Sequence, residues 1–177
     1  MAVMALSSFS MLISCQQNEK QSQDNPNGKP KYFDLPDYFQ KEIDLLSKAN
    51  PEIEKTVSKD DLEETKRLKI KDWELEFSSF KNIDLNKSAY AEFIQVDSAN
   101  NVLQYSFNNP KSDLSCVRIE MDSLGQPKII SIQRDVVNNL YHTAEFLVYE
   151  KGKYYLVEKK QDVKVMGDNQ YRVLGNF

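Results

Sequence analysis

Hydrophobic and polar residues alternate along most of the chain after residue 88. The first clear run is Leu103, Tyr105 and Phe107, which alternate with Gln104 and Ser106. The same period of two recurs at Val117/Ile119/Met121, Ile130/Ile132, Phe146/Val148, Tyr155/Val157, Val163/Val165 and Tyr171/Val173. Strand side chains point alternately to opposite faces, and turn-forming residues separate these runs. The pattern therefore predicts a meander of about six to eight antiparallel strands.

A helical period precedes this region. The apolar residues Leu35, Phe39, Ile43 and Leu46 are spaced by four, four and three positions. Such spacing places them on one stripe of an amphipathic helix. Asp34 can cap the start of this helix. The helix must end before Pro51, because the residue before a proline disfavours the helical conformation.

A second helix is expected after Asp72, which can cap it. Its apolar stripe consists of Trp73, Phe77, Phe80 and Ile83. We interpret the stripe as a packing face against the sheet. The alternative is that Trp73, Phe77 and Phe80 line a ligand-binding cavity.

Residues 52–71 fit two local structures. They can form a hairpin of two polar strands with its turn at residues 58–61. They can also form a helix opened by a weak capping box, Ser58 and Asp61, with Glu63 and Arg67 as an ion pair one turn apart. The first turns of that helix would be polar nearly all round, which is unfavourable for a surface helix. We prefer the hairpin.

Together these elements predict an α+β fold, with a curved antiparallel sheet and two helices packed on one of its faces. We assign a single globular domain to residues 32–177.

The segment before this domain has a different character. Residues 1–14 are apolar or small, carry no charge and end at Cys15. This length suits the apolar core of a signal peptide better than a membrane-spanning helix. Residues Leu12-Ile13-Ser14-Cys15 resemble a bacterial lipobox, and the resemblance implies cleavage before Cys15 and lipidation of that residue. The alternative is a buried apolar strand with an incidental cysteine.

Residues 16–31 contain no aliphatic or aromatic side chain except the rings of Pro26 and Pro30. A segment of this composition cannot bury enough apolar surface to offset the entropy of ordering it. We therefore predict that residues 15–31 comprise the lipidated cysteine and a flexible tether.

Local sequences in the domain also resemble uncharacterised lipoproteins of Bacteroidota-type bacteria. They are Asp72-Trp73, Asn139-Leu140-Tyr141 and Gly167-Asp168-Asn169-Gln170-Tyr171. The resemblance implies an envelope protein held on a membrane by its lipid. We expect the outer membrane, with the domain facing the periplasm or the exterior. The resemblance implies no particular activity.

Charge and motifs exclude several function classes. The chain has 23 Lys+Arg and 27 Asp+Glu, so its net charge is −4, whereas nucleic-acid binders normally carry clustered basic residues. It contains no nucleotide-binding, hydrolase or zinc-protease motif. We expect no enzyme activity, no cofactor, no metal and no nucleic-acid partner. Cys116 lies in a strand-like run and His142 on an apolar strand face, so we interpret both as structural.

Two short sequences resemble the acceptor for O-glycosylation of exported proteins in Bacteroidota. They are Asp97-Ser98-Ala99 and Asp122-Ser123-Leu124, with Ser98 and Ser123 as the modified residues. Both fall in predicted turns. Asp and Ser also favour turns through hydrogen bonds to the local backbone, and we prefer this simpler explanation.

The leading functional hypothesis is a non-catalytic, membrane-anchored lipoprotein of the cell envelope with a binding or structural role. Its partner would be an envelope protein or a glycan, contacted through exposed aromatic residues. The alternative is a carrier of lipid or another lipophilic ligand, held in an apolar cavity between the sheet and the helices.

Overall fold

The computed structural model describes residues 30–109, 112–164 and 167–177. The predicted signal peptide, Cys15 and all but the last two residues of the predicted tether lie outside this part of the chain.

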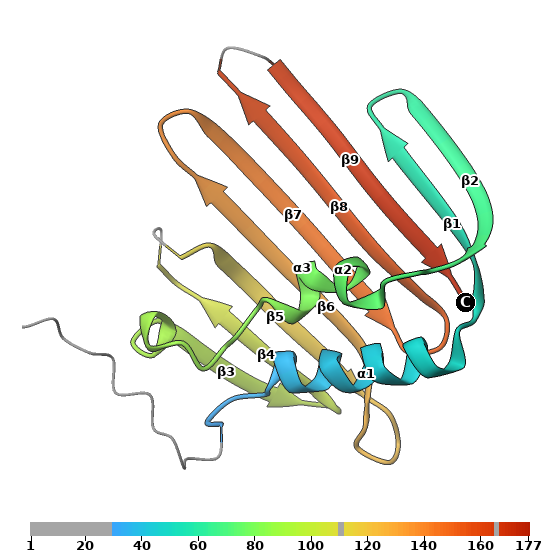
Figure 1. Ribbon diagram of the computed structural model, residues 1–177. Helices are drawn as coiled ribbons and strands as arrows, with labels where there is room; N and C mark the ends of the chain where they lie inside the picture. Colours follow the sequence, from blue (N-terminus) through green and yellow to red (C-terminus); the bar gives the residue numbers. More distant parts are fainter. Residues whose placement is uncertain (1–29, 110–111, 165–166) are drawn as a thin grey trace, which may run out of the picture.

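The domain consists of one open antiparallel sheet with helices on one face (Figure 1). The sheet has nine strands in the order β2-β1-β9-β8-β7-β6-β5-β4-β3. The strands are β1 (Glu52–Lys59), β2 (Leu62–Lys69), β3 (Ile94–Ala99), β4 (Val102–Phe107), β5 (Leu114–Met121), β6 (Pro127–Val137), β7 (Tyr141–Glu150), β8 (Tyr154–Val163) and β9 (Gly167–Asn176). The predicted α+β class is confirmed, with slightly more strands than expected.

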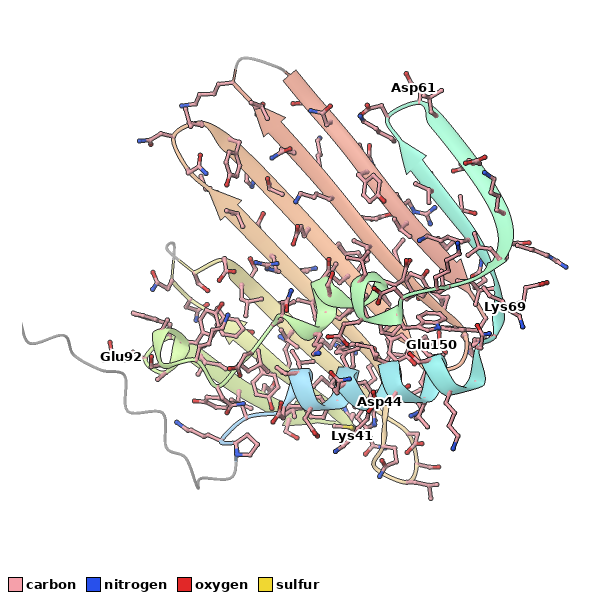
Figure 2. All side chains as sticks on the ribbon, in the orientation of Figure 1. Lys41, Asp44, Asp61, Lys69, Glu92 and Glu150 are labelled. Atoms are coloured by element: carbon pink, nitrogen blue, oxygen red, sulfur yellow. The ribbon has the colours of Figure 1, made fainter. Side chains whose placement is uncertain are left out.

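The first helix, α1 (Leu35–Ala49), has the predicted N-terminal cap and apolar stripe. The side chain of Asp34 accepts a hydrogen bond from the Asp37 backbone N–H at 3.0 Å. Asn50 ends the helix in the left-handed conformation, with a φ of 45°. Phe39 is buried, whereas Lys41 and Asp44 lie on the exposed side of the helix (Figure 2).

The second predicted helix is divided into two short helices, α2 (Trp73–Glu76) and α3 (Ser78–Lys81). Phe77 lies at the junction with φ −98° and ψ 8°. The Ser78 hydroxyl donates to the Leu75 carbonyl at 2.8 Å, a local bond that competes with regular helix geometry. A short 3₁₀ helix, η1 (Ser88–Tyr90), follows.

Residues 52–69 form the predicted hairpin rather than the alternative helix. The sequence pattern did not predict where this hairpin would join the sheet. β1 pairs with β9, so Val57 lies opposite Val173. β2 is therefore one edge of the sheet and β3 the other.

The core lies between the helices and the covered face of the sheet. Its centre is a group of aromatic rings in which Phe77 is 5.4 Å from the Tyr149 ring and 5.3 Å from the Tyr155 ring. The Tyr155 ring also lies against Gly175 on the neighbouring strand. A Cβ atom at Gly175 would lie 2.1 Å from that ring, so only glycine fits there.

Candidate functional site

The contacts of Tyr149 show which face of the sheet the helices cover. Its ring lies 5.6 Å from the Phe39 ring of α1 and 5.4 Å from the Phe77 ring between α2 and α3. Alternate residues of a strand share a face, so Ala144 and Phe146 point to the opposite side. We call that side the outer face; no described helix covers it.

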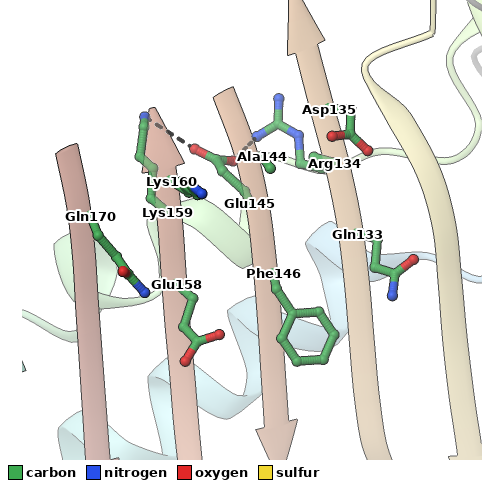
Figure 3. A pocket seen from close by; sticks show the side chains of 10 residues that line it. All are labelled: Gln133, Arg134, Asp135, Ala144, Glu145, Phe146, Glu158, Lys159, Lys160 and Gln170. Carbon is green, nitrogen blue, oxygen red and sulfur yellow. Dashed lines mark hydrogen bonds and ion pairs between the residues drawn. The ribbon is translucent and has the colours of Figure 1, made fainter. Parts of the chain in front are cut away.

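A hollow of about 380 Å³ lies on the outer face, over strands β6 to β9 (Figure 3). Ala144 forms its floor, because its short side chain leaves space among longer neighbours. The outer-face side chains around this floor are Gln133, Asp135, Phe146, Glu158, Lys160 and Gln170. We call this site the outer hollow.

The pairing of the strands brings these residues together from four segments. Asp135 and Lys160 lie directly opposite Ala144 on the two neighbouring strands. In the adjacent row, Gln133 and Glu158 lie on either side of Phe146 in the same way. The hollow is therefore a product of strand register.

The two carboxylates of the hollow have fixed positions. Arg172 donates from Nε to Glu158 at 2.9 Å. The Ser115 hydroxyl donates to Asp135 at 3.0 Å, and His142 Nε2 lies 3.3 Å from the other oxygen of Asp135. Each carboxylate therefore has a neighbour that holds it in place, and the charge of Glu158 is balanced by a guanidinium group.

Other polar groups of the hollow have no such neighbour. Among the described residues, the side chains of Gln133, Lys160 and Gln170 have no hydrogen bond or ion pair with another side chain or with the backbone. All three are exposed. Their hydrogen-bonding groups are available to a ligand.

The polar side chains of the covered face are arranged differently. Glu42 of α1 is 5% exposed, yet Tyr149 donates to its carboxylate at 2.6 Å and Lys151 forms an ion pair with it. Burial, and then the hydrogen bond to Glu42, raise the pKa of the Tyr149 phenol far above its ordinary value. The phenol therefore stays protonated and holds α1 against the sheet.

A tyrosine, a helix carboxylate and a lysine are combined in the same way under α2. Tyr155 donates to Glu76 at 2.6 Å, and Lys55 contacts the same carboxylate at 2.7 Å. Burial, and then the hydrogen bond to Glu76, raise the pKa of Tyr155. These groups hold the helix on the sheet and present no reactive base or nucleophile.

A third carboxylate lies directly before the first residue of β5. Asp113 accepts a hydrogen bond from Tyr90 at 2.6 Å and one from Arg134 at 2.8 Å. Burial would raise the pKa of this carboxyl, but the bonds from Tyr90 and Arg134 outweigh it and lower the pKa. Arg134 also donates to Glu145 at 3.0 Å on the covered side of β7.

A larger hollow, of about 690 Å³, lies between α1 and the β5–β6 turn. Here Lys151 is already paired with Glu42, and the Asp122 carboxylate accepts the backbone N–H groups of Leu124 and Gln126 at 2.8 and 2.9 Å. Lys151 and Asp122 therefore maintain the fold, whereas the buried Tyr38 hydroxyl of this hollow has no hydrogen-bond partner among the described residues. We take the outer hollow as the stronger candidate because it combines fixed carboxylates with three unpartnered polar side chains and an aromatic ring.

The predicted ligand-binding stripe lies in the core. Trp73, Phe77 and Phe80 are 2%, 0% and 0% exposed, and their rings contact one another and the sheet tyrosines. Trp73 also borders a hollow of about 440 Å³ near the end of α1, whereas none of the hollows described above is lined by Phe77 or Phe80. The stripe therefore packs against the sheet, which confirms the interpretation preferred from the sequence.

The two predicted glycosylation residues are both exposed. Ser123 lies in the turn between β5 and β6, as expected. Ser98 lies in the edge strand β3 and not in a turn. The chain reverses immediately after the strand, at Asn100 and Asn101, which both have positive φ. Whether either serine is modified stays a prediction.

Cys116 and His142 both lie on the outer face. Cys116 is half-buried, and burial raises the pKa of its thiol, which makes it a poor nucleophile. The side chain of His142 is 50% exposed, so it lies outside the core and fits the half-buried position that was the other structural alternative. The pattern Leu140, His142, Ala144, Phe146 and Val148 identified one face of β7, but the core takes the other face.

Within the described part of the chain, no group of three or more His, Cys, Asp and Glu residues is arranged to hold a metal ion. No helix in this part is long and apolar enough to cross a membrane. Comparisons with protein-family models, with curated proteins and with solved structures found no match to the chain.

Sequence reasoning missed the outer hollow. Gln133, Ala144, Lys160 and Gln170 belong to different strands and form no local motif. A small residue beside an aromatic one, as at Ala144 and Phe146, is the one local signal of a depression. The side chains around this depression come together through the pairing register of the strands, which the sequence pattern did not predict.

Proposed function

We propose that this protein is a non-catalytic, membrane-anchored binding lipoprotein of the cell envelope that holds a polar ligand in the outer hollow. The observation that carries the proposal is a preformed hollow on an uncovered sheet face, with amide and ammonium groups that have no partner among the described residues. Ligand sites are typically preformed concave surfaces with a few convergent polar groups.

The state of the two carboxylates supports binding rather than catalysis. A glycosidase-type reaction needs one carboxyl that can donate a proton to the leaving group. Glu158 already accepts a hydrogen bond from Arg172, and Asp135 accepts one from Ser115. Both carboxylates therefore serve better as fixed hydrogen-bond acceptors.

The lipobox resemblance at Cys15 supports the membrane anchor, and the composition of residues 16–31 supports a tether between anchor and domain. An outer-membrane position facing the periplasm or the exterior belongs to the same proposal. The lipid-carrier alternative has less support, since Phe77 and Phe80 are completely buried by neighbouring side chains.

Site-specific photo-crosslinking in the native host tests the proposed function. A benzophenone amino acid replaces Phe146 in one strain and Gln95, an exposed residue of β3, in the control strain. We expect a crosslinked adduct at position 146 that is absent at position 95. A second measurement, labelling with radioactive palmitate, tests the anchor, and we expect label in the wild-type chain but not in Cys15→Ser. Equal adducts at both positions, or a chain that carries no lipid, would contradict the proposal.

A further inference from the structure

We propose that the outer hollow binds one unit of a neutral saccharide. This inference names the ligand class of the binding protein proposed above, and it rests on that function. The hollow combines an aromatic wall with side-chain amides and fixed carboxylates. A sugar ring has the complementary arrangement, with apolar C–H faces and a hydroxylated edge.

The aromatic wall is Phe146. It lies two residues from Ala144 on the same strand face, so their Cα atoms are roughly 7 Å apart. Its side chain is half-buried, which leaves part of the ring open to the hollow. The face of an aromatic ring carries negative partial charge and attracts weakly positive C–H groups, so it can pack against a sugar ring.

The amides suit a ligand whose groups both donate and accept hydrogen bonds. Gln133 and Gln170 each offer one carbonyl acceptor and two N–H donors. Lys160 adds donors, and Glu158 and Asp135 add acceptors whose positions are fixed by other residues. Hydroxyl groups at the edge of a sugar can satisfy all of these groups, whereas an apolar ligand would leave them unpaired.

The charges of the hollow favour a neutral ligand. Asp135 and Lys160 lie on opposite sides of Ala144, with Cα atoms roughly 10 Å apart across two strand spacings. Glu158 is balanced by Arg172. With opposite charges placed around it, the hollow has no excess charge that would select a phosphate or a polyanion.

A peptide strand is a poorer occupant. Strands β6 to β9 are interior strands, each paired on both sides. Their backbone groups are therefore unavailable for strand addition, which binds peptides mainly through the backbone. A ligand of the outer hollow must bind through side chains.

Calorimetric titration of the full-length Cys15→Ser chain with neutral oligosaccharides tests this inference. The probes are gluco-, manno-, galacto-, xylo- and N-acetylglucosamine oligomers, with a sulfated oligosaccharide as the anionic comparison. We expect at least one neutral oligomer to bind and the sulfated one not to bind. For the neutral ligand, Phe146→Ala should weaken affinity about tenfold, and Gln133→Ala about fivefold, the value of one hydrogen bond.

Two further variants complete the test. One is a control outside the hollow, and the other fills the hollow. Gln95→Ala removes an exposed glutamine on β3, outside the hollow, and should leave the affinity unchanged. Ala144→Trp fills the hollow and should abolish binding, with near-ultraviolet circular dichroism confirming that the variant folds. Binding that survives both Phe146→Ala and Ala144→Trp would overturn the proposal.

Failure of this inference can be separated from failure of the proposed function. If no neutral oligosaccharide binds at millimolar concentration, the saccharide proposal is wrong. The proposed function would still stand if crosslinking at position 146 captures a ligand of another class in the native host. If an oligosaccharide binds but the wild-type chain isolated from its native host carries no lipid at Cys15, the anchored part of the proposed function is wrong.

Discussion

On the covered face of the sheet, Tyr149 and Tyr155 each donate to a helix carboxylate that a lysine also contacts. On the outer face, Gln133 and Gln170 make no side-chain hydrogen bond with any other described residue. The same strands form both faces, because successive residues of a strand point alternately to the covered face and to the outer face. Tyr149 and Tyr155 hold the helices on the covered face, whereas Gln133 and Gln170 on the outer face are open to a ligand. Substitutions should therefore reduce stability on the first face and binding on the second.

Replacing one phenylalanine on each side of the sheet, Phe77 between α2 and α3 and Phe146 on the outer face, should give the largest contrast. Phe77→Ala removes a ring that is 0% exposed and in contact with Tyr149 and Tyr155, so we expect a loss of about 3–5 kcal/mol in the free energy of unfolding. Phe146→Ala should cost less than about 1 kcal/mol, as substitutions near the surface usually do. Urea denaturation measures both, and similar losses would mean that the outer face is part of the core.

Gly175→Ala should give the next largest effect. The new Cβ would lie 2.1 Å from the ring of Tyr155, whose hydroxyl is held by Glu76. Overpacking of this kind costs about 1–3 kcal/mol. Gln170→Ala, on the outer face of the same strand, should change the melting temperature little. A variant at Gly175 as stable as the wild type would show that the ring is free to move.

Glu42→Gln tests the buried carboxylate that holds α1. The amide can still accept the Tyr149 hydrogen bond, but the ion pair with Lys151 is lost. We expect a loss of about 1 kcal/mol in the free energy of unfolding, because Lys151 is half-exposed and its pairing is screened by solvent. Asp44→Asn, on the exposed side of α1, serves as the matched control and should have no measurable effect.

The buried tyrosines predict a gradual loss of stability at high pH. Their pKa values are raised above the ordinary value of 10.0, so the folded chain keeps protons that the unfolded chain releases. The contribution of these tyrosines to stability should be constant below about pH 10 and fall above it, by up to about 1.4 kcal/mol per pH unit for each tyrosine. Urea midpoints at pH 8 and pH 11 measure the loss.

Phenylalanine variants can attribute that loss to individual residues. Tyr149→Phe with Tyr155→Phe should reduce the difference between the two urea midpoints, because neither ring can then ionise in the unfolded chain. Tyr154→Phe is the control, since this half-exposed residue lies on the outer face. An unchanged difference in the double variant would assign the pH dependence to other groups.

Local patterns predicted the fold well where the signal lies within one element. The stripe from Leu35 to Leu46 and the cap at Asp34 predicted α1, and alternating residues predicted most strands. The face of β7 was harder, because Ala144, Phe146 and Val148 are as apolar as the residues that form the core. Its covered face instead carries Thr143, Glu145, Leu147 and Tyr149.

The candidate site could not be predicted in the same way. Asp135 and Lys160 become neighbours of Ala144 only through the pairing of three strands. Tyr149 and Glu42, which are 107 residues apart, meet only when α1 packs on the sheet. Such contacts depend on topology, and local periodicity contains no information about it.

The place of β9 between β1 and β8 has a consequence for how the chain acquires its structure. Asp60, in the turn after β1, receives a hydrogen bond from the Gln170 backbone N–H, 110 residues later. During synthesis, the β1–β2 hairpin therefore cannot make its contact with the sheet until β9 has emerged. Late pairing of distant strands is slow. The consecutive strands β3 to β8 can pair earlier, so the closing of β9 against β1 should be a late step in the folding of this chain.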